Sequence, residues 1–170
     1  QLGRGNAGLA LRGNGWAGVA KGVVPAYTDR ACMAGPDWPS YLIGTLVSGD
    51  YAGVGGPNIS PPAENWVQAC VAAAPGGPSH VLLTDTVAEH IPGCNMAFYR
   101  RAFDTVGGFD IEYRTAGDDA DFGWRLQQEG HVIAFAPIAF VCNHPRSPSR
   151  ALRTTQAGSG AAEPILRSKH

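Results

Sequence analysis

The sequence predicts an α/β protein in which a mixed sheet is flanked by helices. Short apolar segments alternate with helix-like segments along the chain, a rhythm that favours this class. Hydrophobic residues make up 44% of the chain and charged residues 16%, so a wholly disordered chain is excluded. The 170 residues suffice for one domain with a sizeable core, and the 23 glycines and 13 prolines predict many turns and few long helices.

Charge, hydropathy and cysteine spacing exclude several classes of function. The 13 Lys and Arg residues and 14 Asp and Glu residues leave a formal net charge of −1, which argues against a general binder of nucleic acid. No apolar run approaches the roughly 18–20 residues that a bilayer span requires. No C-x-x-C pair is present, which argues against a zinc cluster. We expect reduced thiols, with one or two disulfides as the alternative, at Cys32, Cys70, Cys94 and Cys142.

The first half of the chain is rich in glycine and predicts short elements. Any helix within residues 1–22 must be held by tertiary packing, because interior glycines each cost roughly 1 kcal/mol of helix stability. Residues 23–28 predict a short buried strand that ends at Asp29, with Pro25 unfavourable to it. The remaining expected elements are a turn at 36–39, a helix at 41–47, a strand-to-loop segment at 51–57, a helix at about 63–73 and a loop at 75–78.

The second half predicts a more regular succession of elements. The segment 118–129 is the clearest helix, with acidic residues in its first turn and Gly130 placed to end it. The other expected elements are a return to the sheet at 91–98, a helix at 100–106 stopped by Gly107 and Gly108, a strand at 131–140 interrupted at Pro137, and a last helix at 161–168.

The strongest candidate for chemistry is the acidic cluster that opens the helix at 118–129. Asp118, Asp119 and Asp121 place three carboxylates within four residues. A carboxylate at this position can act as a general base toward an attacking hydroxyl. In the alternative, Asp118 is an N-cap and the other two only favour the helix dipole. Arg125, four residues after Asp121, is the local cation that can pair with it.

Weaker candidates lie elsewhere along the chain. Asp29 follows a strand, the position at which open α/β sheets bind ligands, although a turn residue is the simpler interpretation. His144 could ligate a divalent metal beside a carboxylate, or be merely structural. Arg146 could meet phosphate oxygens through its planar fork, or be solvated. The segment 92–97 suggests a backbone that turns tightly toward a ligand or another strand.

The order of these motifs along the chain is more specific for a protein family than any single motif. From Val23 onward the chain resembles the family 2 glycosyltransferases, inverting nucleotide-sugar enzymes of the GT-A fold. His144 follows at the expected distance, as do residues 156–160. The segments that carry the resemblance are His-Ile-Pro-Gly-Cys-Asn-Met-Ala-Phe (90–98), Val-Gly-Gly-Phe-Asp (106–110) and Ala-Gly-Asp-Asp-Ala-Asp-Phe-Gly-Trp-Arg-Leu (116–126).

The resemblance implies roles for particular residues. The acidic pair Asp118 and Asp119 supplies the catalytic base, with Asp119 favoured, and Asp121 with Arg125 supports the helix that carries it. Mg²⁺ or Mn²⁺ neutralises the leaving diphosphate, with Asp29 and His144 as metal ligands. The implied donor- and acceptor-binding residues are Asp29, Gly93, Cys94, Asn95, Arg125 and Arg146.

The chain departs from the family pattern in three places. Arg30 and Ala31 stand where further acidic residues are usual, which weakens divalent-metal binding, and Arg30 offers a fixed positive charge for the diphosphate instead. Arg12-Gly13 stands where Ala-Arg is expected, which weakens the expected donor-side contacts there. The family's first, nucleotide-binding strands are expected before residue 1, so we interpret residues 1–170 as a single partial GT-A domain with an open sheet edge and marginal stability.

The resulting expectation is a glycosyltransferase that moves a sugar from a UDP- or GDP-type donor to a carbohydrate or lipid-linked hydroxyl. The resemblance implies a cytoplasmic location, extending to peripheral association with the inner face of the membrane. Two alternatives remain open: a non-catalytic relative that serves as a scaffold or binding module, and a metal-dependent phosphohydrolase that uses Asp29, Asp119 and His144.

Overall fold

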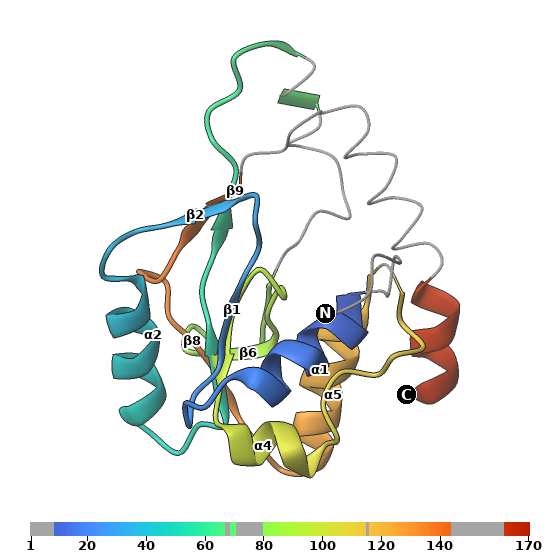
Figure 1. Ribbon diagram of the computed structural model, residues 1–170. Helices are drawn as coiled ribbons and strands as arrows, with labels where there is room; N and C mark the ends of the chain where they lie inside the picture. The colour runs from blue at the N-terminus through green and yellow to red at the C-terminus, as the bar shows by residue number, and fades with distance from the viewer. Residues whose placement is uncertain (1–8, 67–68, 71–79, 115, 144–161) are drawn as a thin grey trace.

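The computed structural model describes residues 9–66, 69–70, 80–114, 116–143 and 162–170 (Figure 1). Two sheets organise the described residues, one of six strands and one of three. The larger has the order β1 (Ala26–Thr28), β7 (Asn95–Phe98), β3 (Gly53–Gly55), β8 (Ile133–Phe135), β6 (Val87–His90) and β5 (Val81–Leu82). The smaller has the order β2 (Cys32–Ala34), β9 (Val141–Asn143) and β4 (Asn58–Ile59).

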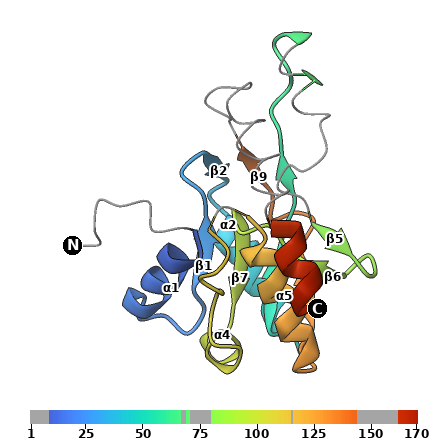
Figure 2. The same cartoon turned by 90° about the vertical axis from the view of Figure 1, so that its right-hand side faces the viewer.

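The larger sheet is mixed and carries helices on both faces, which confirms the predicted fold class. β3 pairs in parallel with β8 and antiparallel with β7. Helices lie on both sides of this sheet (Figure 1). The helices are α2 (Trp38–Val47) on one face, and α1 (Leu9–Val19), α4 (Arg100–Thr105) and α5 (Asp118–Gln128) on the other. A last helix at 162–169 lies against α5 (Figure 2).

The alternation of side chains along each strand divides the core into two clusters. Val54, Ala97 and Ala134 point toward Leu42 and Leu46 of α2. Their strand neighbours point the other way, into an aromatic cluster beneath α4 and α5. The rings of that cluster, with centroids 4.9–6.2 Å apart, belong to Phe98, Phe103, Phe109 and Phe122. The small residues on the α2 side let that helix approach the sheet closely.

Several predicted boundaries are corrected. The strand at 23–28 is not buried: β1 is the outermost strand of its sheet in the described part of the chain, and Ala26 and Thr28 are exposed. An edge strand has no second partner to cover it, and Pro25 is compatible with that position. The predicted turn at 36–39 gives way at Trp38 to α2, which accepts a proline in its first turn.

The other segments follow the predictions to varying extents. The strand expected at 131–140 forms only over β8, before Pro137. The helices expected at 100–106 and 118–129 are confirmed within a residue, and a helix at 162–169 matches the last one. The loop at 75–78 falls outside the described residues, as do residues 67–68 and 71–73 of the helix expected at 63–73. The four cysteines, all described, are free thiols.

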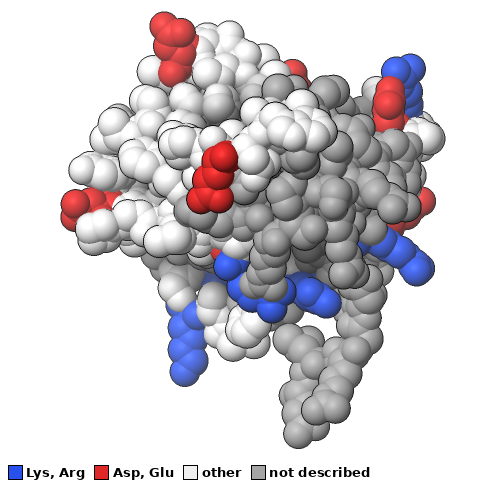
Figure 3. Space-filling view, turned by 90° about the horizontal axis from the view of Figure 1, so that it is seen from above, with Lys and Arg blue, Asp and Glu red and all other residues white. Residues whose placement is uncertain are grey.

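Among the described residues, no helix is long and apolar enough to cross a bilayer. On the face in Figure 3, charged side chains are scattered over a largely uncharged described surface. This pattern agrees with the near-neutral formal charge of −1.

The end of α5 gives a first testable prediction. Gly130 follows the helix with φ of +78° and has open space where a side chain would begin. Gly130→Val therefore destabilises the fold through backbone strain alone, by more than about 1 kcal/mol. Urea unfolding measures the loss, and Gly130→Asn, which tolerates this backbone region better, is the matched control. An unchanged midpoint for the valine variant would show that the helix ends elsewhere.

Candidate active site

The acidic cluster sits at the start of α5, where a glycine makes the backbone turn. Gly117, not Asp118, is the N-cap, and its φ of +89° lies in the left-handed region. A Cβ on Gly117 would lie 2.8 Å from the Cβ of Ala162 and 3.2 Å from the Tyr113 ring. The helix can therefore begin in this crowded position only because residue 117 has no side chain.

Asp119 is anchored to the loop that precedes β7. The Gly93 N–H donates to Asp119 Oδ2 at 2.9 Å, and the Ala120 N–H donates to Oδ1 at 3.0 Å. The loop is itself a tight turn, in which the Asn95 N–H donates to the Pro92 carbonyl at 2.9 Å. The partly exposed carboxylate thus has a fixed orientation, and it forms the polar rim of a small pocket otherwise lined by apolar side chains and glycines.

The strand register places Asp29 near the same loop. Thr28 is paired with Asn95 in the antiparallel β1–β7 ladder, so the next residues, Asp29 and Cys94, continue side by side. Burial raises the pKa of the Cys94 thiol, and the charges of Asp29 and Asp119 raise it further. The structure therefore brings together three of the residues proposed from the sequence: Asp29, Cys94 and Asp119.

The acidity of Asp118 is perturbed by its surroundings. Partial burial raises the pKa of Asp118 from 3.8 to about 6, and the neighbouring charge of Asp119 contributes in the same direction. A carboxyl group with this pKa exchanges its proton near neutral pH, which suits acid–base chemistry. The alternative in which Asp118 is the N-cap is corrected, because Gly117 occupies that position and Asp118 is the first residue of α5.

A pH dependence of stability follows from Asp118. The folded chain holds this proton more tightly than the unfolded chain, so its free energy of unfolding falls as the pH rises from 3.8 to about 6. Asp118→Asn removes that fall. We expect the variant to gain about 2 kcal/mol relative to the wild type between pH 4 and pH 7.5. Urea unfolding at both pH values measures it, with Asp104→Asn at an exposed α4 position as control. A pH-independent difference between variant and wild type would contradict the assignment.

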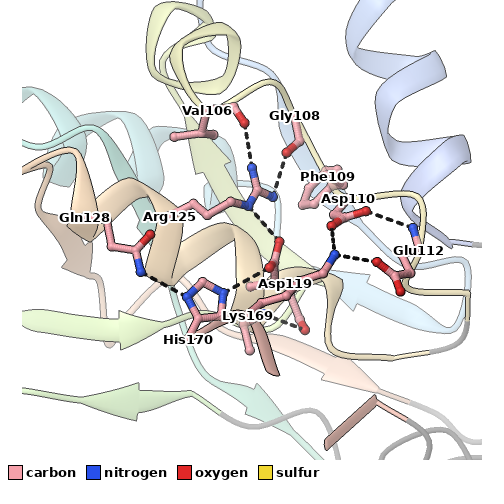
Figure 4. A network of polar contacts seen from close by, with 12 residues as sticks. Val106, Gly108, Phe109, Asp110, Glu112, Asp119, Arg125, Gln128, Lys169 and His170 are labelled. Carbon is pink, nitrogen blue, oxygen red and sulfur yellow. Dashed lines mark hydrogen bonds and ion pairs between the residues drawn. The ribbon is translucent and has the colours of Figure 1, made fainter. Parts of the chain in front are cut away.

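Asp121 and Arg125 form the ion pair that their spacing predicts. Arg125 Nε donates to Asp121 Oδ2 at 2.7 Å, and the carboxylate is only 1% exposed. The two remaining Arg125 nitrogens donate to the carbonyls of Val106 and Gly108 at 2.6 and 2.8 Å (Figure 4). All three guanidinium nitrogens thus take part in tying α5 to the loop after α4, which is a supporting role.

Asn95 also has a supporting place. Its side chain is fully buried, and its amide donates to the carbonyls of Pro57 and Ala139 at 2.9 and 2.7 Å. Its oxygen accepts from the Trp38 indole at 2.8 Å. Both amide hydrogens are committed, so this side chain shapes the ends of β3 and β8 instead of contacting a ligand. Nothing in the sequence identified Trp38 as its partner.

Two proposed residues, His144 and Arg146, lie outside the described residues. In the described ranges, no three His, Cys, Asp or Glu side chains converge as a metal cage would require. Asp29 is exposed and available, but it is a single carboxylate. Sequence reasoning missed Lys169, which contacts Asp110 in the loop before α5, and His170, which contacts Asp121 within α5. No local motif marks them, because their partners are at least 42 residues away in the sequence.

Comparison with known proteins agrees with this geometry. The sequence profile of the glycosyl transferase family group 2 matches residues 37–157. The pre-mycofactocin glycosyltransferases of two Mycobacterium tuberculosis strains, CDC 1551 / Oshkosh and ATCC 25618 / H37Rv, are each 29% identical to this chain over 89 residues. That stretch is 52% of this chain and 19% of each relative, so the chain spans only a small part of their length.

Two solved structures share the fold. The mannosyltransferase PcManGT of Pyrobaculum calidifontis, in complex with GDP-Man and Mn²⁺, superimposes with a TM-score of 0.62 at 19% identity, covering 91% of this chain and 41% of that one. GalNAc-T7 with UDP, GalNAc and Mn²⁺ gives 0.59 at 17% identity, covering 86% and 33%. Both are GT-A glycosyltransferases. The profile match over most of the chain, with this fold, shows that the chain belongs to the glycosyl transferase family group 2.

Proposed function

We propose that this chain carries the acceptor side of an inverting sugar-transfer site, in which Asp119 is the general base. The observation that carries the proposal is the placement of the Asp119 carboxylate at the start of α5, held by the Gly93 N–H at 2.9 Å. Asp29 approaches the same loop from β1. The donor would be a nucleotide-diphosphate sugar of the UDP or GDP type, as in the two structural neighbours.

The proposed step is a single displacement at the anomeric carbon. The acceptor hydroxyl gives its proton to Asp119, and its oxygen forms a bond to the anomeric carbon from the face opposite the diphosphate. The bond from that carbon to the diphosphate oxygen breaks, and its electron pair leaves with the diphosphate. Inversion at the anomeric carbon follows. Each Asp119 oxygen accepts one backbone hydrogen bond and keeps a lone pair for the incoming proton.

A divalent ion fits this site only if the donor helps to hold it. Mg²⁺ is commonly bound by one or two carboxylates together with substrate phosphates, without a cage of protein ligands. Asp29 supplies one exposed carboxylate, and we propose His144 as a second ligand. Mg²⁺ or Mn²⁺ would stabilise the negative charge of the departing diphosphate. Arg30 and Arg146 are proposed to add fixed positive charge, which compensates for Ala31 in the place of a further carboxylate.

The acceptor is proposed to be a carbohydrate or lipid-linked hydroxyl. Gly93 and Cys94, which lie beside Asp119, would line the acceptor side of the cleft. A lipid-linked acceptor would bring the protein to the inner face of the membrane, where its nucleotide-sugar donors are also found.

Calorimetric titration of the chain with UDP and with GDP, each with and without Mn²⁺, tests the donor site. We expect saturable binding of one nucleotide, strengthened by Mn²⁺. A cooperatively folding chain that binds neither would contradict the proposal and favour a scaffold or binding module instead. Release of phosphate from simple phosphate esters, without sugar transfer, would favour the phosphohydrolase alternative.

A further inference from the structure

The last helix ends in two residues that reach the elements around the acidic cluster (Figure 4). Lys169 Nζ pairs with Asp110 and, at 2.6 Å, with Glu112, and it lies 5.4 Å from the centre of the Tyr113 ring. These contacts raise the pKa of Lys169 and lower that of Asp110. Lys169 thereby fastens the loop that leads from α4 into α5.

His170 contacts α5 itself. Its Nε2 lies 3.1 Å from Asp121 Oδ1, and its Nδ1 lies 3.0 Å from the side-chain nitrogen of Gln128. Its ring also meets Trp124 edge-on, with centroids 5.1 Å apart. The neutral tautomer with the proton on Nε2 satisfies both polar contacts: Gln128 donates to Nδ1, and Nε2–H donates to Asp121. One side chain therefore joins the first and last turns of α5.

Asp121 needs this contact because it is buried. Its carboxylate is 1% exposed, with Oδ2 held by Arg125 and Oδ1 by His170. Without His170, one oxygen of a buried carboxylate has lost its described partner, which is costly. The first turn of α5, in which Asp121 lies two residues from Asp119, would then be less firmly held.

We propose that Lys169 and His170 are positioning residues, which fix the start of α5 so that Asp119 faces the Gly93 N–H. The inference rests on the proposed function. Packing at the other end of the last helix supports it, because Ala162 is 5% exposed and contacts the position of Gly117, the residue before the acidic cluster. Residues 162–170 thus meet the start of α5 at two points, Gly117 and Asp121, and hold the preceding loop at Asp110.

Two pairs of variants test the proposal. His170→Ala removes the contact with Asp121, whereas His170→Gln keeps a donor near the position of Nε2. Lys169→Met removes the ion pairs with Asp110 and Glu112, whereas Lys169→Arg keeps them. Glu163→Gln is the matched control on the same helix, because it breaks only the exposed ion pair with Arg167. All are compared by donor turnover, donor KM, melting temperature and hydrogen exchange at residues 118–121.

The expected result separates positioning from general stability. His170→Ala and Lys169→Met lower kcat roughly tenfold with donor KM within about twofold, since a small displacement of the base affects the reacting geometry and not donor binding. His170→Gln and Lys169→Arg restore most of kcat. Hydrogen exchange at residues 118–121 becomes faster only in His170→Ala and Lys169→Met. The stoichiometry of nucleotide binding, which reports the folded fraction, stays unchanged in all variants.

Other outcomes overturn the proposal. Unchanged kcat and exchange in His170→Ala and Lys169→Met would show that the last helix does not position the base. Equal losses in Glu163→Gln, or a loss that follows only the melting temperature and is not rescued by the conservative variants, would show a general structural role. If the wild type neither binds nor turns over a donor, the proposed function fails, and hydrogen exchange alone still decides whether these residues fix the start of α5.

Discussion

Asp119→Asn abolishes sugar transfer while donor binding is retained. The amide has nearly the shape of the carboxylate and can still accept the Gly93 N–H through its oxygen, so the loop and the first turn of α5 keep their geometry. It cannot take a proton from the acceptor hydroxyl. We expect kcat to fall by roughly 10²–10⁴ and the nucleotide dissociation constant to change by less than about twofold, since only an interaction of the transition state is removed.

Steady-state transfer and calorimetry on the same preparations check this expectation. Glu129→Gln, an exposed carboxylate at the other end of α5, is the matched control and should leave both quantities unchanged. Equal losses of transfer and binding would make Asp119 a structural residue. Full transfer by Asp119→Asn would show that another residue is the base. Asp118 would be the first candidate, because its pKa of about 6 suits proton exchange near neutrality. The Asp118→Asn variant then distinguishes the two carboxylates directly.

The predictable part of the fold is the part encoded locally. The acidic first turn and the glycine at each end mark α5 within a residue, because capping and dipole effects act over one or two turns. Burial of a strand is different, since it depends on which strands lie beside it. Residues 23–28 predicted a buried strand, yet β1 is an edge strand. The glycine-rich segment 51–57 predicted only a strand that leads into a loop, yet β3 is the fully buried strand between β7 and β8.

The same division applies to the site. Asp118, Asp119, Asp121 and Arg125 form one local pattern, and the structure shows the pair that their spacing predicts. Asp29 and Cys94 meet through the register of β1 with β7. The family resemblance implied that both residues bind substrate, but neither it nor periodicity predicted this register. The contacts of Asn95 with Trp38 and of His170 with Asp121 join residues 57 and 49 positions apart. Such contacts form only when the sheet and helices pack together, so no local sequence pattern predicts them.

Gly56→Ala should strongly destabilise the fold, because Gly56 follows β3 at a position where two backbone segments approach closely. A Cβ at this position would lie 2.1 Å from the Ala139 carbonyl oxygen and 2.8 Å from that of Ala136. Both neighbours are backbone atoms, and the Ala136 N–H is itself bonded to the Gly55 carbonyl at 2.8 Å, so neither can move without opening the β3–β8 junction. We expect a loss of about 3 kcal/mol in the free energy of unfolding, at the upper end for overpacking by one methyl group.

The matched control is Gly44→Ala, within α2, where no atom lies within 4 Å of the added Cβ. That substitution should stabilise the chain by up to about 1 kcal/mol through helix propensity. Urea unfolding of both variants at one pH gives the comparison, and a Gly56→Ala midpoint equal to the wild type would show that the strand ends do not approach so closely.

The Gly56→Ala substitution should also disturb the candidate site, through the hydrogen bonds of Asn95. The Ala139 carbonyl accepts the Asn95 amide at 2.7 Å, and Asn95 directly follows the Gly93–Cys94 loop that anchors Asp119. In the fraction of Gly56→Ala that remains folded, donor binding should therefore weaken together with transfer, unlike in Asp119→Asn, where transfer alone is lost. A folded Gly56→Ala chain with unchanged binding and transfer would instead mean that the loop keeps its shape independently of the β3–β8 junction.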